Sequence, residues 1–555
     1  MNFNPKYKKL ILMILLVVAV CLLATGIIVS QLVKRTSSEE GSPWFVVESA
    51  ESGQPITLSN VYLISSENGQ VVFVYENETY NIEAKLEESY SGVGDLVFED
   101  GKIKKVFVKP DSITGVLQSY TKNTITFKDN GERKRNENIP IYKISKNEVS
   151  QTDWNNLVIG VTKVKAILEE GSICALIIDE DIVPTDIRVV IKNGDSIFYS
   201  ELYIKKNSSE KIVDVNQALE EQEEKTLKIS DKEGLTLCSK NGDALDESYE
   251  GVFLVTQTEN GLVLVNQLPV ETYIKYVLPS EMPTYFNEEA LKAQAICART
   301  FALSQMGNQT YAMYGANLDD SAAFQVYHKA GRYEITDKAV EDTEGKVIVC
   351  NGELITCYFY STSPGITNDT SAWGTEVPAY VQMQGEELFD GLDLTVESDF
   401  LRFLDGDYQS YDSNSPYYRW KATLSLTAYI DDELGALKKV EVLDRNAAGY
   451  VSKLKLTYEN GEKTFLNESE IRKELGTYID ELVLNDGRVR TDMKTLPSAC
   501  FCVKEVLEDK ILLSGGGFGH GIGLSQYGAN QMGIEGATCE EIIEYYFPNI
   551  TIKRF

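Results

Sequence analysis

The chain has 555 residues, with 84 Asp and Glu against 53 Lys and Arg, and its formal net charge is −31. At roughly 100–200 residues per domain, this length predicts two to four domains. So acidic a chain repels other polyanions, which excludes nucleic acid and anionic membrane surfaces as partners for the bulk of it.

An apolar segment without charges, Leu10–Val29, lies close to the N-terminus and is long enough to span a bilayer as a helix. Three lysines precede it and two cations follow it, which favours a cytoplasmic N-terminus and an exported remainder. We expect a single-pass protein of the cell membrane, with a cytoplasmic tail, a transmembrane signal-anchor and a linker over 1–9, 10–33 and 34–42. The alternative is a signal peptide cleaved near Ala24, where the residues are small.

Short alternating runs broken by turn pairs follow, up to about Pro184. The pairs Asn68-Gly69 and Asn130-Gly131 are typical of tight β-hairpins. They predict one or two small all-β domains over 43–184. Because no cluster of catalytic residue types lies there, we expect this region to serve as a spacer or as a contact surface.

The remainder of the chain mixes helical and strand patterns, so the predicted fold class is α+β. Its domain of helices and antiparallel hairpins is preceded by the small all-β region and by one N-terminal transmembrane helix. The expected helices are Leu291–Met306, Glu468–Leu475 and Glu540–Phe547, and the expected hairpins are Val347–Ser361 and Val440–Tyr458.

Glu281 stands between Pro279 and Pro283, just before the first of these helices. Each proline restricts its own φ and disfavours a helical conformation in the residue before it. The spacing therefore predicts that Glu281 lies in a stiff extended or turned segment, with its carboxylate at a fixed place. The alternative is an ordinary prolyl entry loop.

Asn287 is a suitable N-cap for the helix, and Lys292 and Arg299 recur at i and i+7 along it. Two cations at this spacing could point together toward whatever Glu281 acts on. They could equally be ordinary surface charges.

Two motifs carry a resemblance to a known family. SEMPTYFNEEALKAQAICARTFA contains Glu281, and GFGHGIGLSQYGANQMG contains His520, one of two histidines in the chain. With them the chain resembles the SpoIID/LytB family of sporulation and cell-wall proteins, and the expected domain covers 187–555. Further blocks of the family pattern lie between the motifs in order: SAAFQVY, CYFYSTSPGITND, SPYYRWKATLSL, VEVLDRNAAGYVSKLKL and IRKELGTYIDEL.

The resemblance implies lytic transglycosylation of peptidoglycan. It implies Glu281 as the catalytic acid, and Lys292 and Arg299 as positions needed for activity. The glycine-rich motif allows close approach of a ligand to the backbone, and His520, Gln526 and Tyr527 are our candidates for orienting the glycan. The other interpretation of this loop is structural.

The expected substrate is glycan from which stem peptides have been removed, and the expected partners are an amidase and membrane proteins of the engulfment machinery. The other acids of Glu281's motif, Glu288 and Glu289, suit the positive end of the helix dipole, and the glycine-rich loop contains none, whereas ordinary glycosidases need two carboxylates. One Glu suffices if the sugar's own C6 hydroxyl is the nucleophile. Two alternatives stay open: a glycan-binding module that enhances an amidase, and a vegetative wall scaffold.

Cys350 and Cys357 flank a predicted hairpin turn and could face each other as a disulfide or as half of a zinc site. Some relatives carry zinc near this block, but no histidine accompanies the two cysteines here. We therefore expect no metal and no other cofactor. The second histidine, His328, is predicted to be a surface residue.

Overall fold

The computed structural model describes residues 55–67, 69–84, 86, 88–145, 148–178, 184–221, 225–385, 389, 391–406, 408–427 and 429–554. The predicted tail, transmembrane segment and linker lie outside these residues. Within them, no helix combines the length and the apolar character that crossing a bilayer needs. The described part of the chain is a mixed α+β structure, as predicted.

The chain divides into two compact units. The first is Met1–Arg188 with Gly307–Asn317, and the second is Val189–Met306 with Leu318–Phe555. The segment 307–317, which falls within the expected domain 187–555, is grouped with the first unit. There Arg188 donates its backbone N–H to Asn317 Oδ1 at 2.9 Å and its Nη1 to the Gly315 carbonyl at 3.3 Å.

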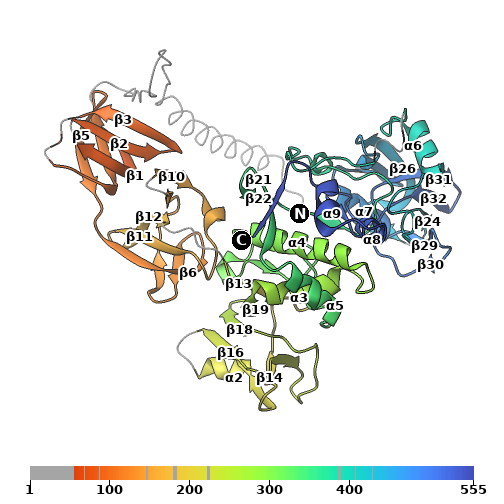
Figure 1. Ribbon diagram of the computed structural model, residues 1–555, viewed down its shortest axis with the longest axis horizontal. Helices are drawn as coiled ribbons and strands as arrows, with labels where there is room; N and C mark the ends of the chain where they lie inside the picture. The colour runs from red at the N-terminus through yellow and green to blue at the C-terminus, as the bar shows by residue number, and fades with distance from the viewer. Residues whose placement is uncertain are drawn as a thin grey trace, which may run out of the picture. The chain divides into compact units, whose positions relative to one another are not determined.

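The first unit begins with a five-stranded antiparallel sheet in the order β3-β2-β1-β4-β5 (Figure 1). The strands are β1 (Ile56–Glu67), β2 (Gln70–Tyr75), β3 (Glu78–Glu83), β4 (Gly92–Glu99) and β5 (Lys102–Val108). Glu67 pairs with Gln70 across the β1–β2 turn, which confirms the hairpin predicted there. Alternate side chains such as Leu63, Phe73 and Leu96 are fully buried and form the core.

A seven-stranded sheet completes the first unit, in the order β10-β9-β12-β11-β6-β7-β8. Its strands are β6 (Ser112–Tyr120), β7 (Thr124–Phe127), β8 (Gly131–Lys134), β9 (Ile141–Ser145), β10 (Glu148–Thr152), β11 (Lys163–Glu169) and β12 (Ser172–Ile178). Phe127 pairs with Gly131, so the second predicted hairpin is also confirmed.

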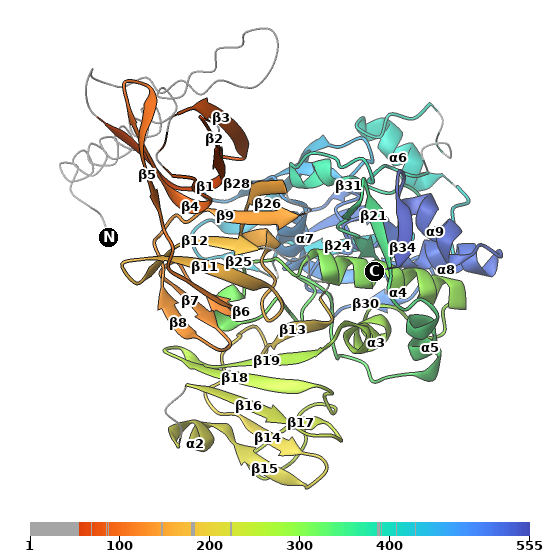
Figure 2. The same cartoon turned by 60° about the vertical axis from the view of Figure 1, so that its left-hand side comes forward.

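The second unit opens with a sheet in the order β16-β18-β19-β13-β20, whose long strands β18 and β19 lie side by side in Figure 2. The strands are β13 (Asp186–Ile191), β16 (Thr226–Ser230), β18 (Val252–Thr258), β19 (Gly261–Pro269) and β20 (Leu318–Asp319). A small sheet, β15-β14-β17, and one short helix accompany it. These are β14 (Tyr203–Lys206), β15 (Lys211–Asp214), β17 (Leu235–Cys238) and α2 (Val215–Glu220).

Three helices that follow lie side by side: α3 (Val270–Glu281), α4 (Glu288–Ser304) and α5 (Glu334–Asp342) (Figure 1). Helix α4 confirms the predicted helix and its cap, because the Asn287 side chain accepts the Glu289 N–H at 2.9 Å. The small face of α4, which includes Ala295 and Ala298, is fully buried.

Helix α3 corrects the prediction for Glu281, which is its last residue and not part of an extended segment. Pro279 lies inside the helix, where it removes one backbone N–H from the last turn. The Ser280 hydroxyl donates to the Tyr276 carbonyl at 2.7 Å, and buried apolar side chains hold this turn against its neighbours. The second proline acts as predicted: Met282, before Pro283, is extended at φ −127° and ψ 136° and ends the helix.

The C-terminal half contains a five-stranded sheet, β30-β29-β24-β32-β31, and a four-stranded sheet, β25-β26-β27-β28. The strands are β24 (Trp420–Ser425), β25 (Ile430–Asp431), β26 (Gly435–Arg445), β27 (Val451–Tyr458), β28 (Glu462–Phe465), β29 (Ile479–Leu484), β30 (Val489–Arg490), β31 (Phe501–Val506) and β32 (Lys510–Gly515). Helices α6 (Glu397–Asp405) and α7 (Glu468–Gly476) belong to this part. The predicted hairpin at 440–458 and the predicted helix at 468–475 are confirmed.

Several short strands and the last two helices remain. They are β21 (Lys346–Cys350), β22 (Glu353–Leu354), β23 (Phe359–Tyr360), β33 (Leu524–Ser525), α8 (Gln526–Ile534), α9 (Cys539–Tyr546) and β34 (Thr551–Arg554). Of these, α8, α9, β21 and β22 contact α4. Helix α9 confirms the helix predicted at 540–547, but it does not close the chain, since β34 follows and pairs with β21.

The contact between Gly515 and Trp420 gives a test of this packing. A Cβ on Gly515 would overlap the Trp420 ring, which is 2% exposed, and the Cys500 carbonyl. We expect Gly515→Ala to lower the free energy of unfolding by about 1–3 kcal/mol, the usual cost of overfilling a core. Urea denaturation measures this, with Ser514→Ala in the same strand as control. Equal midpoints for Gly515→Ala and the parent protein would contradict the packing.

Candidate active site

A cavity of about 520 Å³ in the second unit brings the two sequence motifs together. Glu281 comes from the end of α3, His520 from the glycine-rich loop and Gln526 from the first turn of α8. The remaining lining residues are mostly aromatic or small: Phe301, Ala322, Ala323, Phe324, Tyr358, Phe359, Tyr360, Ser361, Trp373, Arg472, Phe518 and Gly519. Three of the six predicted site residues therefore share one cavity.

Glu281 is the one carboxylic acid among the described residues that line this cavity. Its Oε1 accepts the Val326 N–H at 2.5 Å, which fixes the carboxyl. Burial raises the pKa of Glu281 to about 7, and the hydrogen bond from Val326 opposes this only in part. The carboxyl can therefore be either protonated or ionised near neutral pH, as a group that both gives and takes a proton requires.

The loop that carries Val326 is fastened to both neighbouring helices. Gln325 Nε2 donates to the Ala298 carbonyl of α4 at 3.1 Å, and the Tyr273 hydroxyl of α3 donates to Gln325 Oε1 at 3.1 Å. The position of the Glu281 hydrogen bond is thus set by contacts with buried partners.

His520 lines the cavity, and the backbone holds its imidazole ring. Nδ1 accepts the Ile522 N–H at 3.0 Å, and a backbone hydrogen bond with Phe359 also acts on the ring. Burial, together with the positive charge of Arg472, lowers the pKa of His520 to about 4. The imidazole is therefore neutral at pH 7 and presents a ring surface to a ligand, next to Trp373 at a centroid distance of 5.3 Å.

Tyr527 is the neighbour of Gln526 but does not line the cavity. Its ring packs edge-on against Phe286 at 5.0 Å, and its N–H donates to the Ser361 carbonyl at 3.0 Å. These contacts tie α8 to the segment before α4. They do not place Tyr527 where it would orient a ligand in the cavity.

Arg299 is not directed at the cavity, contrary to the expectation from its helical spacing. It is 1% exposed, and its Nε and Nη2 each lie 2.7 Å from one oxygen of Glu271 on α3. Its other N–H groups donate to the carbonyls of Ala295, Lys346 and Val340. All five N–H bonds are used within the protein, because the side chain ties α4 to α3, α5 and β21.

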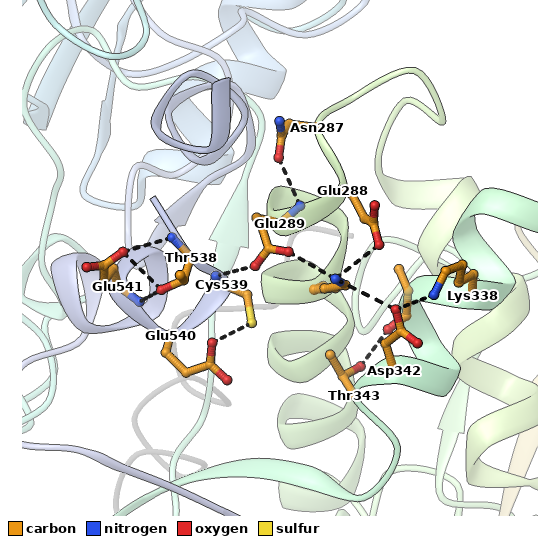
Figure 3. Close-up of polar contacts among 12 residues, drawn as sticks. Asn287, Glu288, Glu289, Lys338, Asp342, Thr343, Thr538, Cys539, Glu540 and Glu541 are labelled. Carbon is orange, nitrogen blue, oxygen red and sulfur yellow. Dashed lines mark hydrogen bonds and ion pairs between the residues drawn. The ribbon is translucent and has the colours of Figure 1, made fainter. Parts of the chain in front are cut away.

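Lys292 also lies away from the cavity and is surrounded by carboxylates. Its Nζ is 3.0 Å from Glu288, 2.9 Å from Glu289 and 3.7 Å from Asp342. The other oxygen of Glu289 accepts the Cys539 N–H, so this group joins the start of α4 to the start of α9 (Figure 3). The predicted convergence of Lys292 and Arg299 on the substrate of Glu281 is therefore wrong.

Arg472, on α7, lines the cavity and was not among the predicted site residues. It lies in the block IRKELGTYIDEL, which carried the resemblance without any signal for a role in the site. Trp373 was missed because it reaches the cavity from a distant segment, and a single sequence does not show that proximity. Phe518 lies two residues before His520 in the glycine-rich motif, but nothing in the sequence distinguished it from a core aromatic residue.

The predicted facing of Cys350 and Cys357 is wrong. The hairpin turns at Asn351-Gly352, so Cys350 pairs with Glu353, and Cys357 lies beyond the second strand. There its buried thiol hydrogen-bonds the thiol of Cys297 on α4. Across the described ranges, no group of three or more His, Cys, Asp or Glu side chains is placed to hold a metal ion.

His328 is buried and not a surface residue. It is 3% exposed, stacks on Tyr249 at 3.8 Å, and its Nε2 lies 3.1 Å from the Ser248 carbonyl. Its sequence neighbours gave no indication of this, because Tyr249 lies about 80 residues earlier in the chain.

Comparisons with known proteins match the whole of the first motif and the glycine-rich motif as far as Gly523. A family model described as SpoIID, Stage II sporulation protein, matches residues 258–350, and a domain of unknown function matches residues 368–523. Stage II sporulation protein D of Bacillus subtilis (strain 168) is 33% identical over 311 residues, which cover 52% of this chain and 76% of the relative.

Two further relatives each match about half of the chain. Stage II sporulation protein D of Bacillus amyloliquefaciens is 29% identical over 310 residues, covering 52% of this chain and 75% of the relative. An amidase enhancer of Bacillus subtilis is 28% identical over 297 residues, covering 51% of this chain and 40% of the relative.

The contacts of Arg299 predict a loss of stability when it is replaced. Arg299→Gln leaves Glu271 without its partner, and removing one member of such a pair costs about 3–5 kcal/mol when the pair is buried. Because Glu271 is 31% exposed, we expect the lower end of that range. Lys292→Gln is the matched control and should change stability by less than about 1 kcal/mol. Thermal unfolding measures both, and an unchanged melting temperature for Arg299→Gln would contradict the assignment.

Proposed function

Because the chain belongs to the SpoIID family, we propose that it is a peptidoglycan lytic transglycosylase, a carbon–oxygen lyase that cleaves glycan strands with Glu281 as its acid and base. The observation that carries the proposal is the single carboxylic acid in the aromatic cavity, with a pKa raised by burial to about 7. Aromatic faces such as Trp373 and Phe518 suit the apolar faces of sugar rings.

The reaction needs one proton donor that then becomes an acceptor. Protonated Glu281 gives its proton to the glycosidic oxygen, and the bond to C1 of the muramic acid residue breaks. The carboxylate then takes the proton of the C6 hydroxyl of the same residue, and the C6 oxygen closes a 1,6-anhydro ring on C1. Glu281 ends protonated again, and no water is consumed.

A hydrolase would need a second carboxylate, either to activate a water or to act as the nucleophile. The described lining of the cavity contains none besides Glu281. Arg472 and His520 are poor replacements, because a guanidinium offers no acceptor and the lowered pKa of His520, about 4, makes its imidazole a weak base. The intramolecular route therefore fits the residues better than hydrolysis does.

In this proposal the protein acts outside the cytoplasm, anchored in the cell membrane by the segment at 10–33. The glycan strands are its substrate, and an amidase and membrane proteins of the engulfment machinery are its partners. The names of the relatives support a role in sporulation or in wall remodelling with an amidase.

A second candidate function uses the same cavity for binding alone, in a module that enhances an N-acetylmuramoyl-L-alanine amidase. One relative is named an amidase enhancer, and the aromatic walls would suffice to hold a glycan. A buried carboxyl with a raised pKa destabilises the fold when it ionises, and binding alone does not need it. This favours the enzyme.

Replacement of the acid gives the direct test. We expect Glu281→Gln to abolish the formation of 1,6-anhydro products from peptide-free glycan strands, because glutamine keeps the shape but cannot give a proton. Mass spectrometry of the products distinguishes the outcomes. Reducing ends in place of anhydro ends would indicate a hydrolase, and unchanged turnover by Glu281→Gln would exclude this residue as the acid. No products from the parent protein would favour the binding module.

The raised pKa of Glu281 predicts how turnover depends on pH. Since the first step needs the protonated acid, kcat should fall as the pH rises through about 7. The measurement is a pH–rate profile on one glycan preparation over about pH 3.5–9. A descending limb near the ordinary value of 4.5 would contradict the burial of this carboxyl.

The dependence of the free energy of unfolding on pH should report the ionisation of Glu281 independently of turnover. The folded state binds the Glu281 proton more tightly than the unfolded state, so this stabilisation is complete below about pH 4.5 and is lost as the pH rises through about 7. Glutamine has no such dependence. We expect Glu281→Gln to gain stability over the parent protein between these values, by about 3 kcal/mol at most. Urea denaturation at pH 5 and pH 8 measures the difference in the free energy of unfolding between Glu281→Gln and the parent protein. An equal difference at both pH values would contradict the raised pKa of Glu281.

A further inference from the structure

Arg472 is the one cationic side chain among the described residues that line the cavity. It projects from α7, which belongs to a different part of the second unit from the helices that hold Glu281. The cavity therefore contains Glu281, which carries out the proposed reaction, and the guanidinium of Arg472, which takes part in none of its steps.

The guanidinium is held in place on two sides only. Its Nε donates to the Leu496 carbonyl at 3.0 Å, and its Nη1 donates to Glu468 Oε1 at 2.9 Å. Glu468 is 4% exposed, so this partner is itself fixed. Nη2 has no acceptor among the residues that the structure describes. Arg299, in contrast, uses all five N–H bonds within the protein.

A held guanidinium with a free terminal nitrogen at a cavity wall is suited to an anionic group on a ligand. The positive charge of Arg472 also acts inside the cavity, because it contributes to lowering the pKa of His520 in the glycine-rich motif. The ligand class follows from what surrounds it. Aromatic side chains that suit sugar rings, next to one cation, match a glycan that carries one carboxylate on each repeating unit.

Peptidoglycan offers such a carboxylate in one state only. The lactyl ether of muramic acid ends in a free carboxylate when no stem peptide is attached, and in a neutral amide when one is. We propose that the Arg472 guanidinium binds this lactyl carboxylate and so makes the site selective for glycan strands without stem peptides. The assignment rests on the proposed function and names the group by which the substrate is recognised.

Arg472 is then a specificity-determining residue. An attached peptide removes the negative charge that the guanidinium would pair with and adds bulk at the same place. A hydrogen bond between charged groups favours the free acid by about tenfold or more. Selectivity of this kind depends on the substrate group and on the side chain together, so it can be tested by changing each separately.

The experiment measures binding of the full chain carrying Glu281→Gln, so that no turnover occurs. The probes are peptide-free glycan strands, and the same strands with their lactyl carboxylates converted to methylamides. We expect the free acid to bind at least about tenfold more tightly than the methylamide. Adding Arg472→Gln should remove this preference, and adding Arg472→Lys should keep part of it. Arg402→Gln, on an exposed arginine of α6, is the matched control and should leave the preference unchanged.

Two outcomes would overturn the assignment alone: equal binding of acid and methylamide by the protein with Arg472 intact, or a tenfold preference that survives Arg472→Gln. The first comparison needs no change at Arg472 and holds even if that variant does not fold. Turnover by the chain with Glu281 separates the proposed function from the assignment. Equal cleavage of both strands would overturn the role of Arg472 only, whereas cleavage and binding of neither would overturn both.

Discussion

The site depends on the burial of one carboxyl at the end of α3. An ionised Glu281 would lose hydration that a single hydrogen bond from Val326 does not replace, so the proton is retained up to about pH 7. Because an ionised carboxyl is unfavourable at this buried position, other contacts of the fold have to keep Glu281 there. It does so with a helix that continues through Pro279 and stops where Pro283 makes Met282 extended.

Arg299 lies outside the cavity, yet its contacts fix the helix that ends at Glu281. Glu271 and Glu281 belong to the same helix, so the two hydrogen bonds between Arg299 and Glu271 fix α3 against α4. The resemblance implied that this position is needed for activity, and the structure supplies a positioning role in place of contact with substrate. Lys292 likewise makes contacts within the protein, and its partner Glu289 joins α4 to α9.

Local sequence patterns predicted the helices and strands well, but they predicted the contacts between distant residues poorly. The cap at Asn287 and the hairpins at Gly69 and Gly131 follow from short-range preferences that act within a few residues. The helical state of Glu281 did not follow, because tertiary packing of α3 overrides the local effect of Pro279.

The site was predictable only where one motif contained the residue. Glu281, His520 and Gln526 were found because two motifs marked them. Arg472 and Trp373 reach the cavity from segments about 100 residues apart, and only the fold brings them together. His328 was misassigned for the same reason, since its burial depends on Tyr249 and Ser248.

The net charge of the whole chain repels an anionic glycan, whereas the positive charge of Arg472 in the cavity attracts it. The net charge of −31 repels such a strand at long range, yet salt screens this repulsion beyond about 8 Å at physiological ionic strength. Contact inside the cavity is decided at shorter range, where Arg472 is near and the surface acids are screened. A strand without carboxylates would gain nothing from Arg472, so the single guanidinium favours a ligand that carries a carboxylate at the place where this side chain meets it.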